Sequence, residues 1–181
     1  GHYLLTARDI KNGKILYSTA RKTTEIAYKS LLTKKSKPEL DDILLTKDGT
    51  LGRLAIVDKV GVCINQSVAV LRPSENTSAK YLFYLLSSPK YQREMLSNAG
   101  GSTIKHIYIT VVDKMKVKFT NLPEQVKIAE FLTAVDNKIE QLSKKQELLG
   151  EYKKGLMQQI FSQAIRFKAD DGSDFPDWAE K

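Results

Sequence analysis

Hydrophobic residues recur at heptad spacing over residues 122–165, which is the longest regular pattern in the chain. Apolar positions alternate three and four residues apart, as do the a and d positions of a coiled coil. The pattern therefore predicts a long helix that buries this seam against a second helix. The residues expected in that interface are Ile128, Leu132, Val135, Ile139, Leu142, Leu149, Leu156 and Ile160.

The start of this helix is marked by Asn121 as a predicted N-cap, with Glu124 placed as in a capping box and Pro123 in the first turn. About 43 residues at 1.5 Å per residue give a rod on the order of 65 Å. Helices beyond about 25 residues are uncommon in globular domains. A coiled coil is therefore favoured over a core helix that folds back on its own domain. Polar residues at two a positions, Gln146 and Lys153, either fix the register or mark a bend.

Short apolar runs separated by turn signals precede the long helix and predict strands. They cover residues 14–17, 42–45, 54–57, 62–71, 104–112 and 115–119. Two short helices are expected among them. The first is capped by Thr77 or Ser78, and the second starts at Ser88 with Pro89 and ends at Gly100. Because strands and helices do not alternate in a βαβ rhythm, the fold class expected is α+β with a mixed β-sheet.

The positive charge of the chain is confined to the part before the helix. Residues 1–122 contain 20 Lys or Arg and 10 Asp or Glu, a net charge of +10. Residues 123–165 carry six of each sign, and residues 166–181 carry three basic and five acidic side chains. This asymmetry is typical of a domain that meets phosphates and a helix that meets protein. A basic domain whose lysines are merely solvated is the alternative.

Composition also indicates the cellular environment of the protein. The sequence has one cysteine, Cys63, expected to be a buried small hydrophobe, and no run of about 18 apolar residues or signal peptide. These features favour a reducing, soluble, intracellular setting. A membrane partner is disfavoured because no basic amphipathic helix or lipidation signal is present.

Two stretches of the long helix, LPEQVKIAEFLTAVDNKIEQL and EYKKGLMQQIFSQAIRFK, resemble the conserved spacer helix of specificity (S) subunits of Type I restriction-modification systems. The resemblance rests on Pro123, Glu124, Gln125, Ile128, Ala129, Phe131, Leu132, Asp136, Lys138, Ile139, Tyr152, Lys153, Gly155, Leu156, Gln158 and Gln159. The target recognition domain of the same family resembles three earlier segments, DDILLTKDGTLGRLAIV, VCINQSVAVLRP and NAGGSTIKHIYITVVDKMKV. Together these stretches cover roughly residues 3–181.

The resemblance implies an α+β target recognition domain at residues 1–121, a spacer and dimerisation helix at 122–165 and a C-terminal tail at 166–181. It implies a subunit that recognises a bipartite site in double-stranded DNA and positions methyltransferase subunits there, with restriction subunits as further candidate partners. It also implies a cytoplasmic location in a bacterium or archaeon.

A whole S subunit of this family carries two recognition domains and two spacer helices, whereas this sequence has one of each. The alternatives are a half subunit that forms a homodimer through antiparallel helices and a fragment of a longer chain. The stretch FPDWAEK resembles the lead-in to a next recognition domain, so Phe175 and Trp178 are expected to complete the partner's domain near Tyr3. A disordered terminus is the alternative. Gly1 and His2 look like a remnant of tag cleavage and are left out of the expected fold.

Basic and hydroxyl side chains near turns are the candidate DNA contacts. Gly49 and Gly52 predict a tight turn with basic residues at its rim, and a hairpin that serves only the fold is the alternative. The glycine pair Gly100–Gly101 either exposes a phosphate-binding backbone or merely ends a helix. The candidate DNA-binding residues are Arg21, Lys22, Thr23, Lys34, Lys35, Lys37, Lys47, Thr50, Arg53, Ser102 and Thr103.

Three polar residues in the family-like segments are given structural roles instead. Asn65 and Gln66 are expected to be buried hydrogen-bonding residues rather than base readers, and His106 is expected to make a structural hydrogen bond. Which residues read bases is left open, because the resemblance carries no information at those positions.

Catalytic motifs are absent from the sequence: it has no Gly-x-Gly cofactor loop, no Asn-Pro-Pro-Tyr-like motif and no Walker loop. The chain is therefore expected to catalyse nothing and to bind no metal or cofactor. The resemblance implies that S-adenosylmethionine and ATP are bound by separate subunits. A coiled-coil adaptor with a non-specific nucleic-acid-binding domain is the alternative from another class, and a small nuclease or methyltransferase is disfavoured.

Overall fold

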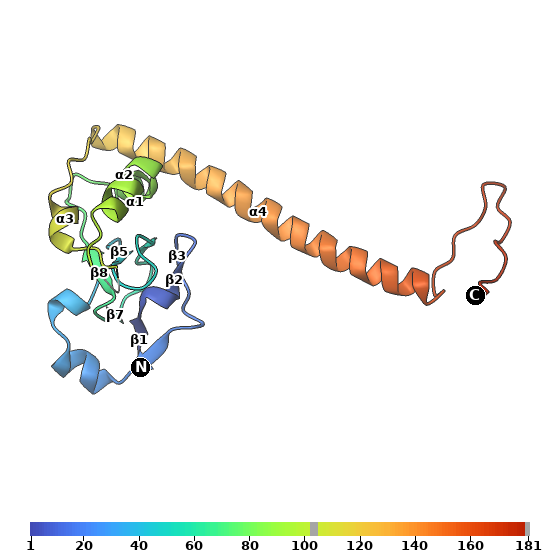
Figure 1. The fold of residues 1–181 in the computed structure, drawn as a ribbon, viewed down its shortest axis with the longest axis horizontal. Helices are drawn as coiled ribbons and strands as arrows, with labels where there is room; N and C mark the ends of the chain where they lie inside the picture. The colour runs from blue at the N-terminus through green and yellow to red at the C-terminus, as the bar shows by residue number, and fades with distance from the viewer. Residues whose placement is uncertain (102–104, 180–181) are drawn as a thin grey trace. The chain divides into compact units, whose positions relative to one another are not determined.

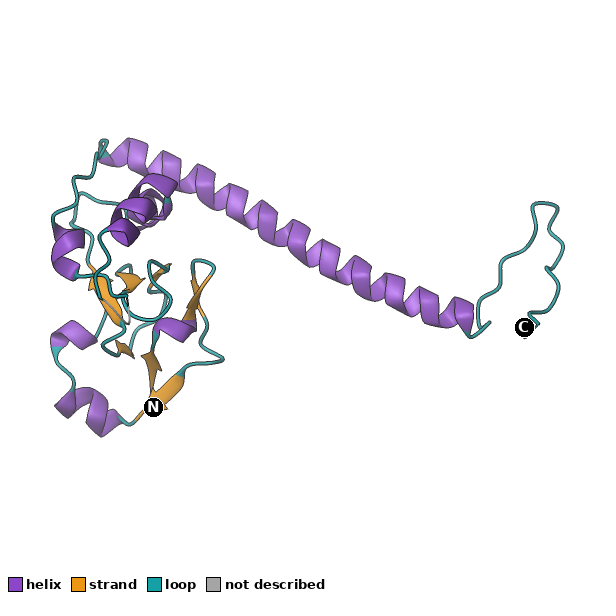
Figure 2. Cartoon of the chain, in the orientation of Figure 1, coloured by secondary structure: helices purple, strands orange, loops and turns teal. Residues whose placement is uncertain are grey.

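The structure, a computed structural model, describes residues 1–101 and 105–179. The chain forms two compact units, Gly1–Leu132 and Thr133–Lys181, and the long helix α4 (Leu122–Phe161) continues from the first into the second. The first unit contains the strands and the short helices (Figures 1 and 2). This combination of mixed sheets and a long C-terminal helix confirms the predicted α+β fold class.

Within residues 1–101 and 105–179, the strands are short and belong to three small sheets, ordered β4-β1-β7, β2-β3 and β6-β5-β8. Their bounds are β1 (His2–Leu5), β2 (Ile10–Lys11), β3 (Lys14–Ile15), β4 (Arg21–Thr23), β5 (Ile43–Thr46), β6 (Leu54–Ile56), β7 (Val62–Ile64) and β8 (Val68–Leu71). The helical elements of the first unit are η1 (Ala7–Asp9), η2 (Ala27–Leu31), η3 (Lys34–Ser36), α1 (Ala79–Ser87), α2 (Pro89–Ser97) and α3 (Ile109–Asp113).

Strand β1 is central in its sheet, with β4 antiparallel on one side and β7 parallel on the other. It was not predicted, and leaving His2 out of the fold was wrong. The His2 ring stacks on Tyr28 with centroids 3.7 Å apart, and its Nδ1 lies 2.8 Å from the Gly61 carbonyl oxygen. Strand β4 was missed as well, because three polar residues carry no hydrophobic period and are ordered by their pairing with β1.

Strand β5 is buried along its whole length because it faces two cores. Leu44 packs with β1, β6 and β7 residues in one cluster, whereas Ile43 and Leu45 pack with α1 and α2 residues in the other. Alternate side chains of a strand point to opposite faces. A strand with a core on each face therefore needs consecutive apolar residues.

The predicted single strand at residues 62–71 is wrong, since β7 and β8 belong to different sheets. The break is at Asn65, whose Oδ1 accepts hydrogen bonds from the Ser67 N–H (3.1 Å) and the Ser67 hydroxyl (2.6 Å). Such an Asx turn redirects the backbone locally. Asn65 is thus a hydrogen-bonding residue, as expected, but Gln66 is exposed rather than buried.

Helices α1 and α2 are confirmed at their predicted starts. The Ser78 side chain accepts a hydrogen bond from the Tyr81 N–H, and Pro89 is the first residue of α2. Helix α2 ends at Ser97 rather than at Gly100, whose backbone instead exchanges two hydrogen bonds with His106.

The strands predicted at residues 104–112 and 115–119 are wrong where the structure describes them: residues 109–113 form α3, and residues 115–119 belong to no strand. The β-branched residues in these stretches favour a strand by propensity alone. The apolar side chains of Ile107, Val112, Met115 and Val117 pack against the core beneath α1 and α2 instead, so tertiary packing overrides the local preference.

Helix α4 begins as predicted, with the Asn121 Oδ1 accepting from the Glu124 N–H at 3.0 Å. The Glu124 carboxylate accepts from the Thr120 hydroxyl instead of closing the expected box. Gln125 is buried, and its amide donates to the Thr120 carbonyl at 2.7 Å and accepts from the Ser78 N–H at 3.0 Å. The first turn of α4 is therefore fixed to the N-terminus of α1. The helix ends at Phe161, four residues before the end of the heptad pattern.

Candidate nucleic-acid interface

Three loops meet at one end of β1. The Lys47 N–H donates to the Ser67 carbonyl at 2.9 Å, and the Lys47 carbonyl accepts from the Ile107 N–H at 2.9 Å. The Ala7 N–H donates to the Ser67 hydroxyl at 3.0 Å, which ties the end of β1 to the same place. We call residues 47–53, 65–67, 100–101 and 105–107 the loop cluster. Each of its loops lies in one of the three segments that resemble a target recognition domain.

The hairpin loop of this cluster has the predicted tight turn, since Gly49 and Gly52 both have φ of 78°. That conformation favours glycine. A Cβ on Gly52 would also lie 2.8 Å from the Gln92 side-chain oxygen. The Gln92 amide donates to the Gly52 carbonyl at 3.1 Å and so anchors the loop on α2. Thr50 is exposed on this anchored loop.

Charged groups clamp the loops of the cluster together. The Asp48 carboxylate is hydrogen-bonded to the His106 ring across 58 residues of sequence, and the Lys47 Nζ lies 3.4 Å from the same carboxylate. Partial burial disfavours the charged form of Asp48, but the hydrogen bond from His106 and the nearby ammonium outweigh it. The pKa of the Asp48 carboxyl therefore lies below its ordinary value. His106 has the structural hydrogen bond expected of it.

Arg53 is also engaged with the protein. It is half-buried, and its guanidinium donates to the Ile10 carbonyl at 3.2 Å. It thereby braces the small β2–β3 hairpin, a role that its place beside a glycine turn gave no reason to expect. Ser102 and Thr103, the hydroxyl candidates of this cluster, lie outside the described residues.

The other basic candidates lie along β4, which pairs with β1, and in the segment that follows it. Arg21 and Lys22 are exposed on β4, and Thr23 is half-buried there. We call residues 24–37, which follow β4, the lysine segment. It carries Lys34 and Lys35, both exposed in η3.

The lysine segment is attached to the sheet through Tyr28. The ring of Tyr28 stacks on His2, and the Lys37 Nζ lies 5.0 Å from the centroid of the same ring. The Lys37 Nζ also lies 3.5 Å from the Lys29 carbonyl. Lys37 is accordingly half-buried, unlike the two exposed lysines before it.

The register of β1 shows which candidates lie together. Thr23 pairs with His2, whereas Arg21 pairs with Leu4. Leu4 precedes Leu5, the β1 residue that contacts the loop cluster. The Asn65 N–H of that cluster donates to the Leu5 carbonyl at 3.1 Å. Four strand residues at about 3.3 Å each thus separate the lysine segment from the loop cluster. Arg21 therefore lies at the same end of β1 as the loop cluster, and the lysine segment forms a second group at the other end.

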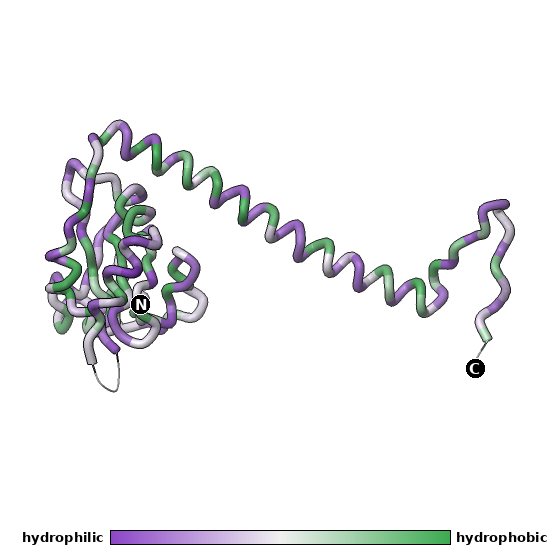
Figure 3. The backbone as a smooth tube through the Cα atoms, turned by 45° about the horizontal axis from the view of Figure 1, so that its top comes forward, coloured by the Kyte–Doolittle hydropathy of each residue, from purple (hydrophilic) through white to green (hydrophobic). Residues whose placement is uncertain are grey.

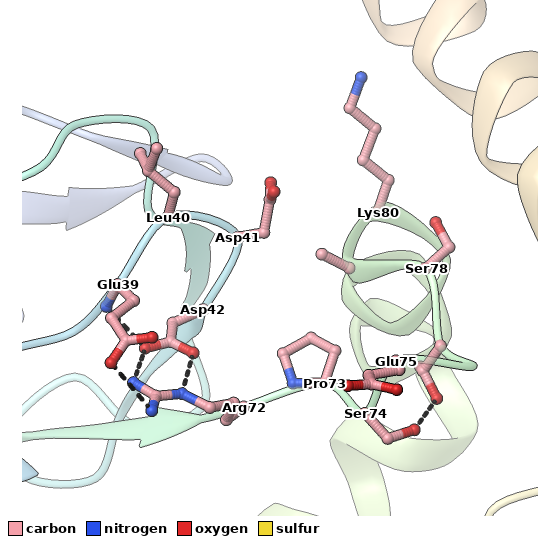
Figure 4. Close-up of a pocket in the computed structure, with 12 residues that line it drawn as sticks. Glu39, Leu40, Asp41, Asp42, Arg72, Pro73, Ser74, Glu75, Ser78 and Lys80 are labelled. Atoms are coloured by element: carbon pink, nitrogen blue, oxygen red, sulfur yellow. Dashed lines mark hydrogen bonds and ion pairs between the residues drawn. The ribbon is translucent and has the colours of Figure 1, made fainter.

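A pocket of about 500 Å³ beside the start of α1 is unsuited to phosphate (Figure 4). The four carboxylates that line it are those of Glu39, Asp41, Asp42 and Glu75. The Arg72 guanidinium in this pocket is already paired, with two nitrogens each 2.8 Å from Asp42 oxygens. Negative charge dominates there, so this pocket is not part of the candidate interface.

Cys63 is buried in β7, as predicted, and burial raises the pKa of its thiol. Within residues 1–101 and 105–179, no group of three or more His, Cys, Asp or Glu side chains is arranged to hold a metal ion. Over the same residues, no helix has the length and apolar content needed to cross a membrane.

The predicted seam of α4 remains largely uncovered. Hydrophobic residues recur between polar ones along the helix (Figure 3). The exposed fractions in the second unit are 40% for Val135, 56% for Ile139, 55% for Leu142 and 55% for Leu149. Leu156 and Ile160 are half-buried, and so are Ile128 and Leu132 in the first unit.

The tail after α4 folds on itself within the second unit. The Arg166 guanidinium donates to the Phe175 and Pro176 carbonyls at 2.9 and 2.7 Å and to the Asp177 carboxylate at 2.9 Å. The Trp178 ring contacts Phe161 edge-on, with centroids 6.1 Å apart. Trp178 is nevertheless 53% exposed.

An α+β domain followed by a long helix is a fold found in restriction-modification proteins. The HsdS subunit from Thermoanaerobacter tengcongensis shares it, with a TM-score of 0.66 over 97% of this chain and 45% of that one, at 16% identity. The Type I restriction-modification S subunit from M. genitalium is 27% identical, with a TM-score of 0.56 over 72% of this chain and 35% of that one.

Sequence comparison leads to the same group of proteins. The family described as Type I restriction modification DNA specificity domain matches residues 1–149, and the chain belongs to this family. The MjaVIII specificity subunit of Methanocaldococcus jannaschii is 28% identical over 165 residues, which are 88% of this chain and 37% of that protein. The chain spans about a third of the length of the curated relatives it matches.

Proposed function

We propose that this chain recognises a DNA sequence as the specificity component of a Type I restriction-modification system. The observation that carries the proposal is the loop cluster, in which three family-like segments far apart in sequence are held together by Lys47, Asp48, Ser67 and His106. Exposed loops anchored on a rigid scaffold are the usual carriers of recognition. Membership of the family favours this function over a non-specific adaptor.

Electrostatics supports DNA as the partner of the domain. Residues 1–122 carry a net charge of +10, and phosphate contacts supply most of the sequence-independent part of DNA affinity. The two basic groups, at opposite ends of β1, suit contacts with separate stretches of the phosphate backbone, since a major groove is about 12 Å wide. Residues 1–121 are thus assigned to recognition.

Helix α4 is proposed as the assembly element. Four seam residues with 40–56% exposure need an apolar partner, and a second α4 in antiparallel orientation supplies the same stripe on a two-fold axis. We assign residues 122–165 to this interface and residues 166–181 to a tail that bears half-exposed aromatic rings.

The chemistry of the system is proposed to lie elsewhere. This chain would position methyltransferase subunits, and restriction subunits as further partners, on a bipartite site without catalysing either reaction. S-adenosylmethionine and ATP would then be bound by those subunits. The curated relatives that match this chain are specificity subunits. This is consistent with a division between recognition and catalysis.

Selection of bound duplexes from a random pool tests the proposal. The full chain should enrich a defined motif above the pool over successive rounds. Retention of duplexes without any sequence enrichment would instead establish a non-specific nucleic-acid-binding protein.

A further inference from the structure

Two apolar side chains of the lysine segment are almost fully exposed. Ile26 is 76% exposed and Leu31 is 77% exposed, at the two ends of the π-helical turn η2. Residues of the same type in the cores of this domain are 0% exposed, as Ile43 and Leu44 are. Turns of the π type are rare and frequently occur at functional sites.

The surroundings of these side chains are basic. The lysine segment holds Lys29, Lys34, Lys35 and Lys37 against a single acid, Glu25. The Glu25 carboxylate is already paired, 2.9 Å from the Lys29 Nζ and 2.6 Å from the His2 ring. The segment therefore presents bare aliphatic groups within a net positive charge.

The backbone that carries these groups is anchored rather than loose. Tyr28, between the two apolar residues, stacks on His2 with an interplanar angle of 8°, and Lys37 lies over the same ring. The His2 ring is held in turn by the Gly61 carbonyl. The segment is thus held to the sheet while Ile26 and Leu31 remain exposed.

Given the DNA-recognition function proposed above, on which this inference rests, we propose that the lysine segment enters a groove of duplex DNA. Its lysines contact phosphates, and Ile26 and Leu31 contact base edges. The major groove of DNA has this arrangement, because thymine methyl groups, which accept apolar contacts, lie on its floor between two rows of phosphates. Ile26 and Leu31 are then specificity-determining residues, because lysines on phosphates carry no sequence information.

The test uses the full chain and the duplex that the wild type selects. The variant I26S/L31S should bind that duplex about tenfold or more weakly, because it can no longer contact the base edges. Its affinity for a random duplex and its salt dependence should stay unchanged. In contrast, K34A/K35A should weaken binding to both duplexes and lower the salt slope.

Two controls keep the result interpretable. L40S changes a half-exposed leucine beside the acidic pocket and should leave DNA binding unchanged. Thermal unfolding of I26S/L31S should match the wild type, because the replaced groups lie outside both cores.

The inference fails if I26S/L31S keeps both the affinity and the selected motif of the wild type, and the DNA-recognition function then still stands. It also fails if the variant keeps DNA binding but loses assembly with the methyltransferase subunits, since the segment is then a protein contact. A wild type that selects no motif overturns the proposed function itself.

Discussion

The two units of this chain treat the same kinds of residue in opposite ways. In the first unit, leucine, isoleucine and valine side chains such as Leu44 and Val62 are buried in two clusters around β5. In the second unit, Ile139, Leu142 and Leu149 stay more than half exposed. The two clusters of the first unit contain the partners of their own apolar side chains, whereas the seam of α4 is expected to pack against a partner.

The largest effect is expected from charge placed in the open seam. The double variant L142D/L149D should convert a self-associated species into monomers, because two carboxylates in an apolar seam would be desolvated on association. Sedimentation velocity checks this result. The matched control N137D/Q141D adds the same charge at positions off the seam and should remain associated. A seam variant with the sedimentation coefficient of the wild type would refute helix-mediated association.

A smaller effect, on the free energy of unfolding, should distinguish the buried leucines of the first unit from the exposed seam residues of α4. In the monomeric L142D/L149D background, L44A should lower the free energy of unfolding by about 2–5 kcal/mol, since it opens a cavity in a fully buried cluster. In the same background, I139A should change it by less than about 0.5 kcal/mol, as for other surface positions. Urea unfolding followed by circular dichroism compares the two. Equal losses would show that the seam is already covered within one chain.

Local signals account for the part of the fold that the sequence predicts. Ser78 and Pro89 mark helix starts, Asn121 caps α4, and Gly49 with Gly52 marks a turn, since each acts through its own backbone. Strands β1 and β4 were missed because pairing distant in sequence orders them.

Only single residues of the candidate site, and not the contacts between them, could be predicted from the sequence. Lys47 and Thr50 could be named from a glycine turn, but the hydrogen bond between Asp48 and His106 joins residues 58 apart and follows from the fold alone. The contact of Arg53 with Ile10 is likewise tertiary. Sequence patterns identify which residues are candidates, whereas their division between two ends of β1 depends on strand register.

The lysine segment of the first unit can be tested through the salt dependence of DNA binding. The triple variant K34A/K35A/K37A should lower the salt slope of DNA binding by up to about three units, about one for each lysine that no longer neutralises a phosphate. Fluorescence anisotropy at several salt concentrations provides the slope. An unchanged slope and affinity would exclude the lysine segment from the interface. K144A, on α4, is the control and should have no effect on the slope.

The smallest expected effect concerns the clamp of the loop cluster. Because the pKa of Asp48 is lowered in the folded state, the ionised carboxylate stabilises the fold above its ordinary pKa of about 4. That contribution is lost as the pH falls through the lower pKa of the folded state. D48N should therefore be less stable than the wild type at pH 6, and the difference should shrink toward pH 3. Urea unfolding at several pH values measures it, and a difference independent of pH would contradict the assignment.

The most direct test of the account compares the DNA sites selected by the wild type and by L142D/L149D. If one domain reads one half-site and α4 joins two chains on a two-fold axis, the wild type should select an inverted repeat interrupted by unread bases. Half-site centres about 34–36 Å apart would place both domains on one face of the duplex. The monomeric variant should select a single half-site from the same pool. A single uninterrupted asymmetric motif selected by both proteins would contradict the account.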